Sequence, residues 1–334
     1  MDNQQKSIQN FVNDRNHSKK LFTAGPASLL PENLTGLRPC FGRGDEDYSK
    51  VEESVLTHLK KMTGHSHIAR LQGSASLALE IMSLNFLYGD VLVVKTGYYS
   101  DRMFWLAESA ERRIKQIRKV DTVHWQELDK VAGKYDWLVA CSTETSCGLK
   151  IEIPKLRKTA ESIGAKLMLD ATASVGLEND HENADVISYS SCKGLFGITG
   201  ACFIAFNHIP NHEIDSFYLD LATHLEKRMT GPYHSIASLA DVLPKHNEIK
   251  QSVIINKKKF LTDYKKWVLY PENNQPLLCT YVDCKISTKD SSVILYKPRS
   301  DLRGSVVCHL GEAHLAENAK GLIQNVLVVK EVQK

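Results

Sequence analysis

Two short apolar stretches that end in reactive side chains decide how this sequence is interpreted. The first is Ala184-Asp-Val-Ile-Ser-Tyr-Ser-Ser-Cys-Lys-Gly-Leu-Phe-Gly197, in which an apolar run ends in small polar residues, Lys193 and a glycine. The second is Lys166-Leu-Met-Leu-Asp170, which is followed by Ala171-Thr-Ala-Ser174. Short apolar runs bounded by small residues are typical of buried strands in parallel sheets. The sequence therefore predicts one amine and one carboxylate at the ends of successive strands.

This pairing suits the chemistry of pyridoxal phosphate. Lys193 would form a Schiff base with the aldehyde of the cofactor, and Asp170 would keep the ring nitrogen protonated. The positive charge on that nitrogen makes the ring an electron sink. The alternative is two unrelated surface charges at strand ends, which any α/β protein carries.

The composition is that of an ordinary soluble globular protein. The chain has 334 residues, of which 43% are hydrophobic and 24% charged, with a net charge of +3. This length allows two domains, or one large α/β domain with an appendage. Lys and Arg are spread among acids, so we expect no nucleic-acid surface. The most basic stretch, residues 112–119, is interpreted as a solvated helix face or the lead-in to a strand.

Cysteine use and the first residues indicate a cytoplasmic protein. The eight cysteines form no CxxC pair and several lie in apolar strand contexts, which favours free thiols in a reducing compartment. No apolar run reaches the length of a membrane span, and the polar start of the chain lacks a signal-peptide core. We expect no membrane partner and no metal site. Residues 1–20 are interpreted as a polar arm that is flexible or lies on a partner subunit.

Strands and helices alternate through the middle of the chain. The predicted helices cover residues 73–87, 100–113 and 156–163, and the predicted strands cover 90–94, 137–141, 165–169, 186–189 and 201–206. This alternation predicts a mainly parallel sheet covered by helices on both faces. In such sheets ligands bind where the strands end.

The character of the sequence changes after Tyr218. A long helical segment covers residues 235–261 and is broken or kinked at Pro244, and strands at 277–282, 292–296 and 305–308 and a helix at 315–327 follow. We therefore predict a polar arm (1–20), a large domain (21–234), and a connecting helix with a small α+β domain (235–334).

Other strand ends carry groups suited to the rest of the cofactor. Ser74 and Ser76 open the first strong helix, where hydroxyls and backbone amides could hold a phosphate. Tyr99 could stack on a flat ring. The hydroxyl-rich run 142–148, with one acid, suits the phenolic oxygen of the ring. The alternatives are an ordinary serine N-cap and plain tyrosine packing.

In this order the motifs resemble the class V branch of the fold type I pyridoxal-phosphate aminotransferases. Within it the chain is most similar to 2-aminoethylphosphonate–pyruvate transaminases and alanine–glyoxylate aminotransferases. The similar segments, from Leu21 to about Glu312, are Leu21-Phe-Thr-Ala-Gly-Pro-Ala, Gly42-Arg-Gly-Asp-Glu-Asp-Tyr48, Gln72-Gly-Ser-Ala-Ser, Gly97-Tyr-Tyr-Ser-Asp-Arg, Thr143-Glu-Thr-Ser-Cys-Gly, Leu169-Asp-Ala-Thr-Ala-Ser-Val-Gly and Ser190-Ser-Cys-Lys-Gly.

The resemblance implies a fold type I transferase that binds pyridoxal 5'-phosphate and works as a homodimer with the site at the subunit interface. Lys193 and Asp170 would be the catalytic residues. The implied cofactor contacts are Ser74, Ala75, Ser76, Tyr99, Thr145, Asp170, Ser191, Lys193 and, from the partner subunit, Thr230. The last assignment competes with a simple N-cap turn, since Tyr233 stands where the family has threonine.

One departure concerns the substrate. The family has an arginine near the C-terminus that pairs with the substrate carboxylate. Here Ser305-Val-Val-Cys-His-Leu-Gly-Glu312 places Val306 at that position. Arg303 is the first candidate to replace it and Arg299 the second; the alternative is that the amino donor or acceptor is bound differently.

Three functions compete on this evidence. The first is an aminotransferase acting on a small amine or amino acid, including phosphonate amines such as 2-aminoethylphosphonate, with an oxo acid. The second is another class V reaction, such as that of a lyase, decarboxylase or desulfurase. Desulfurases place His where this chain has Cys192 and Tyr99, which argues against them. The third is a non-catalytic protein that keeps the fold.

Overall fold

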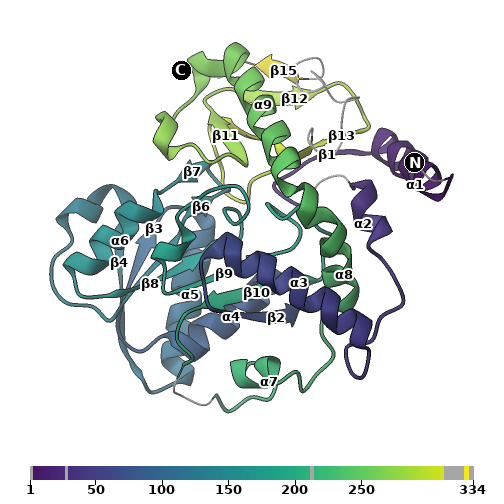
Figure 1. Cartoon of the computed structure of the whole chain (residues 1–334). Coiled ribbons are helices and arrows are strands. Elements are labelled where there is room, and N and C mark those ends of the chain that lie inside the picture. The colour runs from purple at the N-terminus through teal and green to yellow at the C-terminus, as the bar shows by residue number, and fades with distance from the viewer. Residues whose placement is uncertain (1–2, 27–28, 211–213, 312–326, 331–334) are drawn as a thin grey trace.

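The computed structural model describes residues 3–26, 29–210, 214–311 and 327–330 (Figure 1). A seven-stranded sheet forms the centre of the molecule. Its strands follow the order β2 (His67–Gln72), β10 (Ala201–Phe206), β9 (Val186–Ser190), β8 (Lys166–Asp170), β5 (Trp137–Cys141), β3 (Gly89–Lys95) and β4 (Ile117–His124). Among these strands β10 is the one that pairs antiparallel with both neighbours. The predicted mainly parallel sheet is confirmed.

Helices cover both faces of this sheet, as predicted. One hydrophobic cluster contains side chains of α3 (Glu46–Thr63), α6 (Ile153–Ser162) and α8 (Tyr233–Val242). The other contains side chains of α4 (Ala75–Phe86), α5 (Tyr98–Arg113) and α7 (Leu221–Leu225). Strand β10 shows the alternation directly, because Phe203 packs in the first cluster and Ile204 in the second. The sheet is therefore buried on both sides.

The C-terminal part begins with a helical segment that is interrupted at Pro244, as predicted. Helix α8 ends at Val242, the short turn η3 (Leu243–Lys245) contains Pro244, and α9 runs from His246 to Tyr264. Strand β11 (Cys279–Val282) pairs with β14 (Ser305–Cys308), and β12 (Lys285–Thr288) pairs with β15 (Leu327–Lys330). Of the predicted helix 315–327, residues 315–326 lie outside the described residues, and Leu327 begins β15.

The start of the chain joins this C-terminal part. The predicted polar arm contains α1 (Asn3–Ser18), and α2 covers Pro31–Thr35. Between them β1 (Lys20–Phe22) pairs in parallel with β13 (Val293–Leu295) (Figure 1). Residues 20–22 are thus hydrogen-bonded to the predicted small domain, and the division at 20, 234 and 334 stays a prediction.

The remaining described elements are short. They are β6 (Thr143–Glu144), β7 (Leu149–Lys150), η1 (Trp125–Lys130), η2 (His181–Asn183), η4 (Lys265–Trp267) and η5 (Glu272–Asn274). Across the ranges given above, no helix combines the length and the apolar character needed to cross a membrane.

Replacing Phe203 with Ala should destabilise the protein strongly. Its ring is fully buried and stacks on Tyr189 at a centroid distance of 5.2 Å. Removing a buried phenylalanine ring costs about 3–5 kcal/mol. Urea unfolding measures the loss, with Phe217→Ala as the control, since the Phe217 side chain is 62% exposed. Equal midpoints for the two variants would contradict this packing.

Candidate active site

The carboxyl ends of the parallel strands surround one cavity of about 380 Å³. It contains most of the residues that the sequence assigns to the cofactor, although these come from separate segments of the chain. The predicted residues that line it are Ser74, Ala75, Ser76, Tyr99, Thr145, Asp170 and Lys193. No cluster of His, Cys, Asp and Glu suited to a metal ion occurs in the part of the chain that the structure describes.

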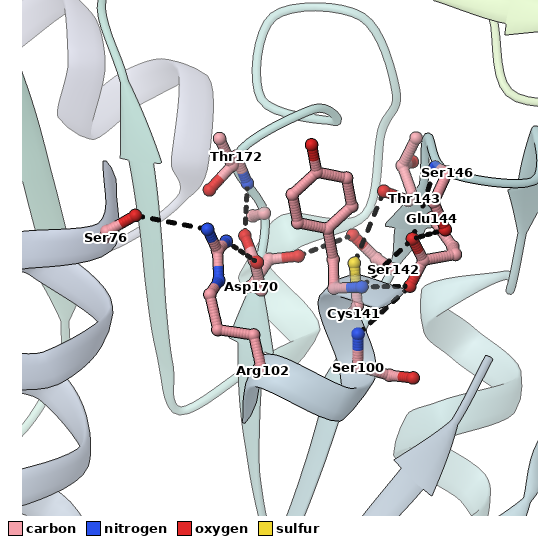
Figure 2. Close-up of polar contacts among 12 residues, drawn as sticks. Ser76, Ser100, Arg102, Cys141, Ser142, Thr143, Glu144, Ser146, Asp170 and Thr172 are labelled. Atoms are coloured by element: carbon pink, nitrogen blue, oxygen red, sulfur yellow. Dashed lines mark hydrogen bonds and ion pairs between the residues drawn. The ribbon is translucent and has the colours of Figure 1, made fainter. Parts of the chain in front are cut away.

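Asp170 is the last residue of β8, and its side chain is only 2% exposed. One carboxylate oxygen accepts a hydrogen bond from the backbone N–H of Thr172 at 3.0 Å. The other accepts a hydrogen bond from Nη2 of Arg102 at 3.2 Å, as Figure 2 shows. A buried carboxylate needs such compensation, because its desolvation is costly.

Lys193 lies in the loop that follows β9. Its Nζ donates a hydrogen bond to the backbone oxygen of Ala24 at 2.8 Å. Gly25 packs directly on the lysine, since a Cβ there would lie 2.7 Å from Cγ of Lys193, and its φ of +109° suits glycine. Burial lowers the pKa of the Lys193 amine. A lowered pKa increases the fraction of neutral amine, the form that attacks a carbonyl.

The predicted phosphate cradle lies at the start of α4. Ser74 is the N-cap residue of this helix, but its side chain makes no capping hydrogen bond. The structure therefore does not use this serine as an ordinary cap. The hydroxyl and the first amides of α4 lie at the positive end of the helix, where an anion is stabilised.

A second buried carboxylate, Glu144, positions Tyr99. The backbone N–H groups of Tyr99 and Ser100, in the first turn of α5, each donate to its carboxylate at 3.0 Å. The hydroxyl of Ser146 also donates to it (Figure 2). Burial raises the pKa of Glu144, and the hydrogen bonds from Ser146, Ser100 and Tyr99 oppose that shift. The acid of the hydroxyl-rich run therefore caps a helix, whereas Thr145 from the same run lines the cavity.

Other predicted residues lie outside the cavity lining. The hydroxyl of Ser191 is buried and donates to the backbone oxygen of Ala201 at 3.1 Å. Thr230, which the sequence assigns to the site of a partner subunit, is exposed. Val306 is a residue of β14, and its side chain is buried in a hydrophobic cluster. It therefore presents no group to a substrate in the cavity.

The structure separates the two arginine candidates. Nε of Arg303 lies 3.3 Å from a carboxylate oxygen of Asp283, and its side chain is 54% exposed. Arg303 is not among the residues that line the cavity, whereas Arg299 is. Nη1 of Arg299 donates to the hydroxyl of Tyr98 at 3.0 Å. The second candidate from the sequence is thus the one beside the cavity.

Arg102 is a cavity residue that the sequence interpretation missed. It contacts Asp170, donates to the hydroxyl of Ser76 at 3.1 Å, and its guanidinium carbon lies 4.9 Å from the centre of the Tyr99 ring. The sequence could have identified Arg102 by its position three residues after Tyr99, because residues i and i+3 lie on the same face of a helix.

Comparisons with known proteins agree with the resemblance. No family model matches the chain. A 2-aminoethylphosphonate–pyruvate transaminase of Pseudomonas fluorescens is 27% identical over 258 residues, which cover 68% of each protein. An aspartate aminotransferase of Thermus thermophilus has a TM-score of 0.76 at 20% identity, covering 92% of this chain and 97% of that one. An alanine–glyoxylate aminotransferase of Nostoc has a TM-score of 0.75 at 15% identity, covering 92% of this chain and 95% of that one. The predicted resemblance and the fold type I architecture are confirmed.

Replacing Glu144 with Gln should loosen the start of α5. The amide keeps the shape of the side chain but removes the charge that accepts several hydrogen bonds. Weakening these bonds should speed hydrogen exchange at the amides of Tyr99 and Ser100 by roughly 10- to 100-fold. Glu127→Gln is the control, because Glu127 is exposed. Unchanged exchange in the Glu144 variant would refute the positioning role.

Proposed function

We propose that this protein is a pyridoxal-phosphate-dependent aminotransferase that moves an amino group between a small amine or amino acid and an oxo acid. The observation that carries the proposal is the arrangement of Lys193 and Asp170 in one cavity with the Ser74–Ser76 cradle and Tyr99. The similarity to transaminases in sequence and to aminotransferases in fold supports the same class. Fold alone would not assign the chemistry, so the side chains carry the argument.

The polar groups of the cavity fit the proposed cofactor. Thr172 and Thr143 line the cavity, and their buried hydroxyls have no hydrogen-bond partner among the described residues. Buried hydroxyls are normally satisfied, so these two favour a polar ligand. Lys193, Asp170, Tyr99 and the Ser74–Ser76 cradle would hold the cofactor's aldehyde carbon, ring nitrogen, ring face and phosphate. When bound, the cofactor supplies an electron sink.

Asp170, Tyr99 and Lys193 would then each have a separate role in the reaction. The carboxylate of Asp170 holds a proton at the ring nitrogen, and Tyr99 orients the ring by stacking. Nζ of Lys193 takes the proton from the substrate carbon that bears the amino group and returns a proton later in the reaction. Burial lowers the pKa of Lys193, which increases the fraction of its amine that is neutral and able to accept a proton.

The charges around the cavity favour an anionic substrate. Two arginines, Arg102 and Arg299, line it, against the single carboxylate of Asp170. We propose that Arg299 binds the carboxylate or phosphonate of the substrate, because Arg299 lines the cavity and Arg303 does not. An amine of the 2-aminoethylphosphonate kind and an oxo acid such as pyruvate both carry the required charge.

We further propose a cytoplasmic homodimer. The partner subunit's Thr230 would complete the phosphate site, and the exposure of this threonine on each chain allows that contact. The free cysteines suit a reducing compartment. Analytical sedimentation measures the oligomeric state of the protein. A monomer that retains full activity would refute the proposed homodimer.

A panel of amines and oxo acids tests the function. Added to the purified protein with its cofactor, a true donor should convert the visible absorbance of the Schiff base to that of the aminated cofactor, and an oxo acid should reverse this change. A product that has lost carbon or sulfur would instead indicate a lyase, decarboxylase or desulfurase. Absence of any visible band would favour a non-catalytic protein.

Asp170→Asn should retain the bound chromophore but lose most turnover. The amide cannot hold the ring nitrogen in its positively charged form, so the electron sink is weakened. Steady-state rates with the best donor measure the loss. Near-normal turnover would remove Asp170 from its proposed role.

Arg299→Ala should raise KM for carboxylate or phosphonate substrates by about 10- to 100-fold, because one charge-assisted contact is lost. Arg303→Ala is the matched control and should leave KM unchanged. A larger effect from the Arg303 variant would reverse this assignment.

A further inference from the structure

The guanidinium of Arg102 connects two parts of the cavity that the proposed cofactor would use. Figure 2 shows it reaching from α5 to Ser76 on one side and Asp170 on the other. We propose that Arg102 is a positioning residue that gives the Ser74–Ser76 cradle its positive charge, so that the site selects the phosphorylated cofactor over unphosphorylated pyridoxal. This inference rests on the proposed function.

At the cradle, Arg102 supplies what the local residues lack. Ser74, Ala75 and Ser76 offer amides and hydroxyls but no cationic side chain. Nη1 of Arg102 lies 3.1 Å from the hydroxyl oxygen of Ser76. A phosphate at a helix N-terminus is bound more tightly when a full positive charge stands beside the helix end.

The contact also sets the direction of the serine hydroxyl. Arg102 is always a donor, so the oxygen of Ser76 must accept this hydrogen bond. The hydroxyl hydrogen of Ser76 is then free to point away from the arginine and donate to an anion. A hydroxyl that already accepts from a cation is a stronger donor, because hydrogen bonds in a chain polarise one another.

The other basic side chains that line the cavity make their hydrogen bonds away from the cradle. Lys193 donates to the backbone oxygen of Ala24, and Arg299 donates to the hydroxyl of Tyr98. Among the residues that line the cavity, Arg102 is therefore the cation that contacts the cradle.

Three contacts hold the guanidinium in place, namely Ser76, Asp170 at 3.2 Å and the face of Tyr99 at 4.9 Å. A planar fork can make all of them together, whereas a lysine ammonium is a single point of charge. The same group thus fixes the carboxylate of Asp170 relative to the cradle. We expect lysine to restore the charge but not the bridge.

The test compares two ligands on the full-length chain, freed of cofactor by dialysis against an amine. Pyridoxal phosphate and pyridoxal are each titrated and followed by absorbance and protein fluorescence. Arg102→Gln should lower the affinity for pyridoxal phosphate by roughly 10- to 100-fold, because one charge-assisted contact is lost. It should lower the affinity for pyridoxal much less. Arg102→Lys should fall between Arg102→Gln and the unmodified protein.

Arg113→Gln is the matched control, because Arg113 lies on the same helix and pairs with Glu80 at the surface at 2.8 Å. It should leave both affinities unchanged. If Arg102→Gln binds pyridoxal phosphate as well as or better than the unmodified protein, or weakens both ligands equally, the inference is overturned. If Arg102→Gln fails to fold, the same comparison with Arg102→Lys decides. An unmodified protein that binds neither ligand would refute the proposed function itself.

Discussion

A carboxylate buried at the end of β8 is the constraint on which the proposed site depends. Asp170 is almost completely removed from water, and a buried charge without partners would cost several kcal/mol. The backbone of Thr172 and the guanidinium of Arg102 compensate it from two directions. One of these partners belongs to the loop after β8 and the other to α5. The stability of the carboxylate therefore depends on how that helix is placed against the sheet.

The placement of α5 depends on a second buried carboxylate. Glu144 accepts hydrogen bonds from the backbone N–H groups of Tyr99 and Ser100 in the first turn of α5. Figure 2 shows the contact between Glu144 and Ser100. Arg102 lies one turn further along the same helix and reaches Asp170. The ends of β3, β5 and β8 are thus connected through one helix start. This connection brings an aromatic face, a cation and a carboxylate into one cavity.

Much of the fold could be predicted from short apolar runs, because buried strands leave a clear local signal. The bounds of β5, β10 and β14 agree with the prediction, and the helix breaks at Pro244 because proline has no backbone N–H to donate.

Strand β2 was missed because it contains Arg70, a charged residue whose burial depends on its ion pair with Glu52 of α3. Arg102 was missed for a similar reason, because its hydrogen-bond partners Ser76 and Asp170 are distant in sequence. The motif around β14 could not show whether Arg303 or Arg299 replaces the family's arginine. Both residues precede this strand, and the path of the loop that contains them decides which side chain reaches the cavity.

Reduction of the protein with borohydride in the presence of pyridoxal phosphate, followed by peptide mapping, tests the central claim most directly. The account predicts that the cofactor is attached to Lys193, the one lysine that lines the described cavity. Attachment at Lys166 or Lys150, or at many lysines in equal amounts, would contradict it.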